Sequence, residues 1–142
     1  MVKYISYELG DGAKRPYKKY SGDAGWDLFI CNDCVIPSGE TVDIHTNIKI
    51  QLPHGYYARI TGRSSSLRKH NLLVNEGIID NGYTGELFVC VHNVGAEDVA
   101  LKKGMRVAQV LIHKIEDVRW SEVDHIDSDT DRGNNGFGST GR

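Results

Sequence analysis

An alternation of apolar and polar residues between positions 42 and 52 restricts the fold of this chain more than any other feature. The even positions carry Val, Ile, Thr or Leu, whereas the odd positions carry Asp, His, Asn, Lys or Gln. A period of two residues over this length predicts a β-strand with one buried face. Such a strand needs partners, and further strands are predicted at about 56–61, 87–92 and 106–115.

Turns that contain glycine separate the predicted strands, and a helical pattern is almost absent. Pro53-His54-Gly55 and Asn81-Gly82 are typical of tight turns, and the best helical candidate is a short one at 65–71. Short strands with frequent turns indicate an all-β fold, which is a sandwich, a jelly roll or a barrel. The length of 142 residues favours a single β domain, predicted at residues 1–126.

The charge balance argues against two classes of partner. Lys and Arg number 17 and Asp and Glu number 19, which gives a formal net charge of −2. Neither duplex nucleic acid nor an anionic membrane is therefore expected as a partner. No apolar run approaches the ~20 residues that a membrane-spanning helix requires.

The cysteines indicate the compartment rather than a reactive site. The chain has three Cys, which cannot all pair with one another, and no apolar signal region opens it. A reducing compartment is expected, either the cytoplasm or the host cytoplasm if the protein is viral. Cys31 and Cys34 have the spacing of a metal site, but a second ligand pair at metal spacing is missing, so no metal site is predicted there.

The end of the chain differs in kind from the rest. Residues 127–142 are polar and rich in Gly, which predicts a flexible arm beyond the β domain. Arg132 offers a planar fork suited to phosphate, and Phe137 has a ring that can stack on a nucleobase. The glycine spacing at 136–141 matches a dinucleotide-binding fingerprint, but no helix can follow it, so that interpretation fails. A flexible chain end without a ligand is the alternative.

Four positions of the β domain carry groups that suggest chemistry. Arg63 is followed by three serines at the start of the predicted helix, which is typical either of an anion site or of an ordinary capped helix. Asp80 precedes a hairpin turn, where a carboxylate acts as a general base or stabilises the turn. Asp27 follows a loop of small residues, and Gln109 lies in an apolar strand where it needs a polar partner, as does Arg106 in the same strand.

In order and spacing, these segments and the arm resemble the five sequence motifs of the trimeric deoxyuridine triphosphatases (dUTPases), over residues 24–141. The resemblance implies a jelly-roll-like β-barrel of the dUTPase type with a flexible C-terminal arm. It also implies a homotrimer with shared active sites that hydrolyses dUTP to dUMP and pyrophosphate, lowering dUTP and supplying dUMP for thymidylate synthesis. Mg²⁺ is implied as the cofactor, with phosphate oxygens and water as its ligands rather than protein side chains.

The same resemblance implies a role for each motif. Asp80 corresponds to the residue that activates the attacking water, Asp27 supports the site, and Phe137 stacks over uracil. The residues implied for uracil and deoxyribose are Asn75, Gly77, Ile79 and Tyr83. The residues implied for the α- and β-phosphates are Arg63, Ser64, Ser65 and Gln109. The residues implied for the γ-phosphate are Arg132, Gly138, Ser139 and Thr140.

Two other functions compete with this one. Arg63-Ser64-Ser65 followed by Arg68 also resembles the dCTP deaminases of the same fold, but the catalytic Glu of that branch lies where this chain has Cys90. The other alternative is a non-catalytic β-module that binds a nucleotide. Asp80 together with the complete tail counts against that alternative.

Overall fold

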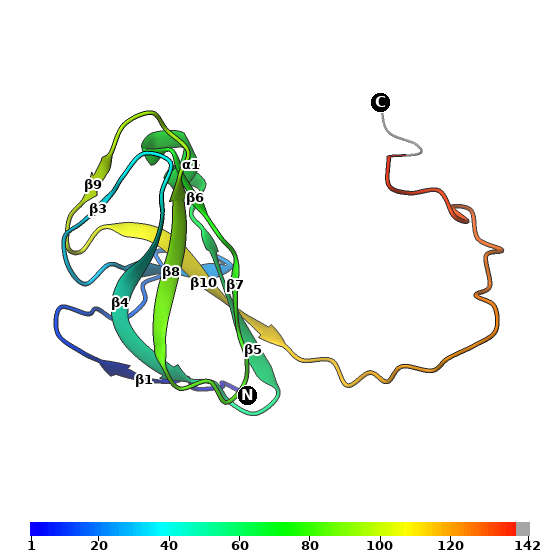
Figure 1. Cartoon of the computed structure of the whole chain (residues 1–142). Helices are drawn as coiled ribbons and strands as arrows, with labels where there is room; N and C mark the ends of the chain where they lie inside the picture. The colour runs from blue at the N-terminus through cyan, green and yellow to red at the C-terminus, as the bar shows by residue number, and fades with distance from the viewer. Residues whose placement is uncertain (139–142) are drawn as a thin grey trace.

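The computed structural model describes residues 1–138, whose strands and short helix are shown in Figure 1. In chain order the elements are β1 (Ser6–Leu9), β2 (Gly25–Phe29), β3 (Cys34–Ile36), β4 (Thr41–Gln51), β5 (Tyr56–Gly62), α1 (Ser64–His70), β6 (Leu72–Val74), β7 (Gly77–Ile79), β8 (Glu86–Asn93), β9 (Val99–Leu101) and β10 (Arg106–Lys114). All four predicted strands are present within a residue or two, and the helix begins one residue earlier than predicted, at Ser64.

Two four-stranded antiparallel sheets and one two-stranded sheet build the body of the protein. Their strand orders are β1-β4-β8-β6, β2-β10-β5-β7 and β3-β9. The core contains buried side chains of both larger sheets, such as Ile44 and Val89 from one and Ile60 and Val110 from the other. The expected jelly-roll-like all-β fold is confirmed, although strand pairing within residues 1–138 forms separate sheets rather than a closed barrel.

Strand β4 confirms the predicted alternation, although its pairing with β8 is irregular in the middle. Its alternate apolar side chains face the core. The register with β8 shifts between His45 and Lys49, and Asn47 within this shift has a left-handed φ of 54°. The buried hydroxyl of Thr46 donates to the carbonyl of Leu87, which satisfies a backbone acceptor beside the irregular part of the ladder.

Helix α1 connects β5 of one large sheet to β6 of the other. It has only 7 residues, so its position depends on packing more than on helical propensity. Ser66 is 2% exposed, and its hydroxyl donates to the carbonyl of Val107 in β10. Asn71 ends the helix with a left-handed φ of 55°. These contacts hold Arg63 and Ser64 next to β10.

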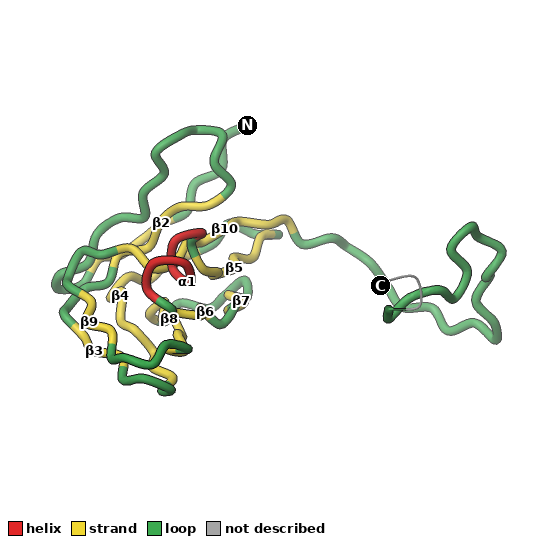
Figure 2. Tube along the Cα trace, turned by 90° about the horizontal axis from the view of Figure 1, so that it is seen from above, coloured by secondary structure: helices red, strands yellow, loops and turns green. Residues whose placement is uncertain are grey.

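After β10 the chain leaves the sheets. Figures 1 and 2 show the residues beyond Lys114 as an extended segment directed away from the body. Most of its described residues are exposed. The division into 1–126 and an arm at 127–142 stays a prediction, and the last described strand ends earlier than that boundary. No helix within residues 1–138 has the length and apolar character needed to cross a membrane.

Candidate active site

A polar hollow of about 580 Å³ opens beside β2, β10 and the start of α1. It is lined by Tyr17, Lys18, Lys19, Tyr20, Asp23, Ala24, Gly25, Asp27, Arg63, Ser64, Arg106 and Gln109. Four of the residues predicted from the sequence, Asp27, Arg63, Ser64 and Gln109, therefore share one cavity. Ser65, the next residue of α1, is half-buried and does not line it.

The Asp27 carboxylate holds two guanidinium groups in this hollow. Arg63 Nε donates to Asp27 Oδ1 at 3.0 Å, and Arg106 Nη1 donates to Oδ2 at 3.3 Å. Arg63 also donates from Nη1 to the carbonyl of Arg106 at 2.9 Å. The Asp27 side chain is only 21% exposed, so solvent screens these charge-assisted bonds less than on an open surface. Because a guanidinium group has five N–H donors, both arginines keep donors for an anionic ligand.

Strand β10 places Gln109 between Asp27 of β2 and Thr61 of β5. Its side-chain nitrogen donates to the carbonyl of Gly62 at 3.1 Å, which is the polar partner that the sequence predicts it to need. Its side-chain oxygen lies so close to Gly25 that a Cβ there would approach it to 2.6 Å. Glycine at this position therefore leaves room for the Gln109 amide.

The predicted general base lies elsewhere, in the turn between β7 and β8. Asp80 directly follows β7, and the N–H of Tyr83 donates to its carbonyl at 3.1 Å. Gly82 has a φ of 96°, in the region that favours glycine. The Asn81 side chain donates to two carbonyls at the β4–β5 turn, at 2.9 and 2.8 Å. The turn is thus anchored, while the side chains of Asp80 and Tyr83 remain exposed.

The other residues predicted for uracil and deoxyribose lie around this turn. Gly77 and Ile79 belong to β7, and Asn75 is exposed just before it. The Tyr83 hydroxyl donates to the carbonyl of Glu86 at 2.7 Å, which fixes the ring across the turn. The structure therefore groups Ile79 and Tyr83 with the predicted general base, whereas Asn75 lies at the other end of β7, near the Arg63 end of β5.

The two groups of predicted residues lie at opposite ends of β5. The β5–β7 register places Asp80 beside Tyr57 near the start of β5, whereas Arg63 directly follows Gly62 at its end. Positions 57 and 62 are about 16 Å apart along a strand that rises roughly 3.3 Å per residue. Asp80 does not line the hollow of Arg63. A single chain does not bring the predicted base to the predicted phosphate-binding groups.

The residues predicted for the arm lie away from both groups. Arg132 Nε donates to a carbonyl within the arm at 2.8 Å, and Phe137 is fully exposed. Figure 1 shows this part of the chain, which ends with Gly138, far from the sheets. Ser139 and Thr140 lie outside the described residues.

Three cationic residues of the hollow, Arg106, Lys18 and Lys19, are given no ligand-binding role by the prediction from the sequence. The sequence does contain a signal for Arg106, because an Arg inside an apolar strand needs a polar partner, and Asp27 is that partner. Lys18 and Lys19 carry no such signal, since neighbouring lysines before a polar loop are typical of a solvated surface.

The cysteines and the donor groups offer no metal site. Burial raises the pKa of the thiols of Cys31, Cys34 and Cys90, which disfavours the reactive thiolate. Within residues 1–138, no group of three or more His, Cys, Asp or Glu side chains could hold a metal ion. A divalent cation here would need ligands from a bound molecule.

The fold and the hollow define a class of protein, namely a jelly-roll-like β protein with two guanidinium groups held side by side in a polar hollow. The chain belongs to the dUTPase family, whose sequence profile matches residues 11–141. It is 40% identical over 143 residues to the deoxyuridine 5′-triphosphate nucleotidohydrolase of fowlpox virus (strain NVSL), an alignment that covers 99% of each protein.

Solved structures of this family share the fold. The dUTPase of Staphylococcus bacteriophage 80alpha with dUpNHpp matches with a TM-score of 0.91 and 26% identity, covering 99% of this chain and 100% of that one. A mutant dUTPase of the S. aureus phage phi11, described with a structural Mg(II) ion, matches with a TM-score of 0.82 and 23% identity. The latter match covers 89% of this chain and 100% of the phi11 chain and shows the fold alone.

We expect Asp27 and Arg106 to be energetically coupled, because their ion pair is partly buried. A double-mutant cycle of Asp27→Ala and Arg106→Ala, measured by urea unfolding at one protein concentration, should give a coupling of about 1–2 kcal/mol. The exposed pair Glu8–Lys49, with its charged atoms 3.9 Å apart, is the matched control. It should give less than about 0.5 kcal/mol, and equal coupling in the two cycles would contradict the expectation.

Proposed function

We propose that this protein hydrolyses dUTP to dUMP and pyrophosphate. The observation that carries the proposal is the hollow in which Asp27 orients the guanidinium groups of Arg63 and Arg106. Paired guanidinium groups in a partly buried site fit a polyphosphate. Membership of the dUTPase family supports a deoxyuridine triphosphate as that polyphosphate. The reaction lowers dUTP and supplies dUMP for thymidylate synthesis.

In the proposed reaction, Asp80 accepts a proton from a water molecule as the water oxygen attacks the α-phosphorus. A bond forms between that oxygen and the α-phosphorus. The bond from the α-phosphorus to the α–β bridging oxygen breaks, and its electron pair leaves with pyrophosphate. Arg63 and Gln109, with the hydroxyls of Ser64 and Ser65, bind the phosphates and stabilise the charge that develops on the leaving group.

Mg²⁺ is the proposed cofactor. When bound to the triphosphate, it would neutralise part of the phosphate charge and so favour departure of pyrophosphate. Phosphate oxygens and water are its proposed ligands, as the resemblance to the dUTPases implies.

The nucleoside is recognised, in this proposal, by the turn after β7. Tyr83 packs beneath the deoxyribose, and its anchored ring offers no partner to a 2′-hydroxyl. The main chain of Gly77 and Ile79 reads the uracil edge, with Asn75 beside it. Phe137 covers the base from the arm, and Arg132, Gly138, Ser139 and Thr140 close on the γ-phosphate.

A homotrimer with shared active sites is also proposed. The separation of about 16 Å along β5 between the Asp80 turn and the Arg63 hollow supports it, because a second copy that brings its own turn to the hollow completes the site. The arm of a third copy then supplies the groups that cover the nucleotide.

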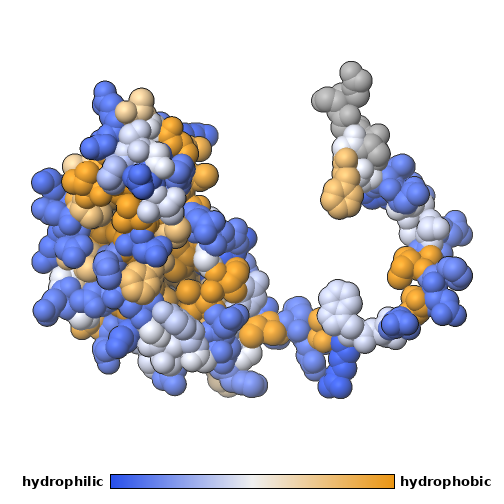
Figure 3. Space-filling view, in the orientation of Figure 1, coloured by the Kyte–Doolittle hydropathy of each residue, from blue (hydrophilic) through white to orange (hydrophobic). Residues whose placement is uncertain are grey.

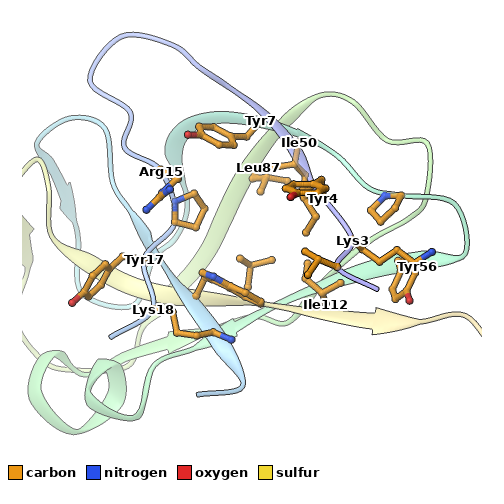
Figure 4. Close-up of a pocket in the computed structure, with 16 residues that line it drawn as sticks. Lys3, Tyr4, Tyr7, Arg15, Tyr17, Lys18, Ile50, Tyr56, Leu87 and Ile112 are labelled. Atoms are coloured by element: carbon orange, nitrogen blue, oxygen red, sulfur yellow. The ribbon is translucent and has the colours of Figure 1, made fainter. Parts of the chain in front are cut away.

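An apolar hollow of about 570 Å³ on the same body supports contact between copies. Figure 4 shows the side chains that line it, among them Tyr4, Tyr7, Ile50, Leu87 and Ile112. Burying such a surface against another apolar surface is favourable.

The proposed occupant is segment 116–126 of another copy. Its side chains Val118, Trp120 and Ile126 are 73%, 101% and 81% exposed in one chain, and Figure 3 shows apolar side chains along this segment. The segment carries four carboxylates and one Arg, while Lys3 and Arg15 lie at the hollow. The segment is therefore complementary to the hollow both in its apolar side chains and in its charge.

The proposed location is the cytoplasm, or the host cytoplasm if the protein is viral. Cys31, Cys34 and Cys90 are all free thiols, which fits a reducing compartment.

Pyrophosphate release from dUTP, dCTP and UTP tests the proposed activity. We expect dUTP to be the best substrate, with kcat/KM for UTP at least about 100-fold lower, because a 2′-hydroxyl against the Tyr83 ring loses its hydrogen bonds. Release of ammonia from dCTP would favour the deaminase alternative. Binding of dUTP without turnover would favour a non-catalytic module.

Asp80→Asn tests the general base. The fold and dUTP binding should be retained, while kcat falls about 10²–10⁴-fold, because the amide cannot accept the proton from water. Asp11→Asn, which changes another exposed carboxylate, is the control and should leave kcat unchanged. Near-normal turnover in a well-folded Asp80→Asn protein would remove Asp80 from this role.

Mixed oligomers test the arm and the shared site together. Deleting residues 132–142 should leave the oligomer and its stability nearly intact and abolish most activity, because the arm has too few apolar residues to stabilise the core. Mixing these subunits with full-length Asp80→Asn subunits should restore activity that neither parent has. Mixed oligomers confirmed by mass measurement but without activity would show that each arm serves its own subunit.

A further inference from the structure

The loop before β2 is fixed against the polar hollow. Tyr17 and Asp27 exchange backbone hydrogen bonds, since the N–H of Tyr17 donates to the carbonyl of Asp27 at 3.0 Å and the N–H of Asp27 donates back at 2.6 Å. Lys18 and Lys19 follow this bridge, and both line the hollow. Their positions are therefore set by the same residue whose carboxylate orients the two arginines.

Aromatic rings hold both lysine ammonium groups. Lys18 Nζ lies 3.6 Å from the centroid of the Trp26 ring, and Lys19 Nζ lies 5.3 Å from that of Tyr20. Tyr20 is itself held by a turn in which its N–H donates to the Asp23 carboxylate at 3.2 Å. A ring stabilises an ammonium group without neutralising it, so the charge of each lysine stays available to an anion.

The hollow has an excess of positive charge that the five motifs do not explain. Its charged residues are Lys18, Lys19, Arg63 and Arg106, and Asp23 and Asp27. Four cations less two anions leave a formal charge of +2, and Asp27 is already shared between the two arginines. Within residues 1–138, no carboxylate forms an ion pair with either lysine.

We propose that Lys18 and Lys19 form a further binding element for the pyrophosphate portion of the nucleotide. This proposal rests on the proposed function and extends its site. Cations on an anchored loop at the opening of a partly enclosed cavity attract a polyanion from a distance. Ammonium groups on flexible stems can then follow the β- and γ-phosphates, whereas the arginines stay oriented by Asp27. The lysines favour triphosphate and pyrophosphate over the monophosphate product.

The test compares two double variants of the full-length protein. Lys18→Gln/Lys19→Gln removes two charges from the hollow, and Lys49→Gln/Lys102→Gln removes two exposed charges elsewhere. Inorganic pyrophosphate is the probe, measured by calorimetry at low and high salt. The first variant should bind it about 3- to 30-fold more weakly at low salt, and the difference should shrink at high salt. KM for dUTP should rise by a similar factor with kcat unchanged.

Pyrophosphate binding by Lys18→Gln/Lys19→Gln equal to that of the wild type would overturn the proposal. An equal loss of binding in the control variant would also overturn it, because the effect would then be due to net charge. Lys18 also lines the apolar hollow, so the oligomeric state of each variant is checked by mass measurement. If it changes, Lys19→Gln alone replaces the double variant, because Lys19 lines the polar hollow and not the apolar one. A wild-type protein that does not hydrolyse dUTP rejects the proposed function, while pyrophosphate binding still decides the role of the lysines.

Discussion

Strand β10 is the element on which the polar hollow depends, because it pairs with β2 along one edge and with β5 along the other. The ladder with β2 shifts between Arg106 and Ala108. This irregularity allows two consecutive residues, Val107 and Ala108, to be fully buried. In a regular strand, side chains three positions apart point to opposite faces. The irregularity therefore allows Arg106 and Gln109 to reach the same hollow. The ion pairs of Asp27 with Arg63 and Arg106 therefore depend on the pairing of β10 with β2 and β5.

The separation of the proposed general base, Asp80, from the cationic hollow has an electrostatic consequence. A carboxylate within about 4 Å of a guanidinium group forms an ion pair, which would compete with the phosphates for the arginines of the hollow. One carboxylate, that of Asp27, already orients Arg63 and Arg106. Holding Asp80 at the far end of β5 keeps it from pairing with these cations in its own chain. In the proposed homotrimer, assembly of copies determines when base and phosphate site meet.

The sequence predicts the elements well and the relations between them poorly. The alternation along β4 fixes a strand and its buried face, and Gln109 in an apolar strand requires a polar partner, which the structure supplies. The shift in the register of β4 with β8 around Asn47 could not be predicted, because Asn is tolerated both in a regular strand and in the left-handed region. The distance between the motifs of Arg63 and Asp80 depends on the register of β5 with β7, which sequence spacing does not encode. Lys18 lies at the hollow because backbone hydrogen bonds between Tyr17 and Asp27 hold its loop there, and no sequence pattern indicates that pairing.

In the proposed homotrimer, the extended segment after β10 connects assembly to closure of the site. Residues 116–126 carry the apolar side chains that need a partner, and the arm begins only after them. From Ile126 to Phe137 is a span of eleven residues, which reaches at most about 36–40 Å when fully extended. The proposed docking of 116–126 on another copy would fix the start of the arm at that copy's surface, so the docking contact would select which hollows Phe137 can reach. In this proposal, a segment too polar to fold alone is directed to one site by the apolar residues that precede it.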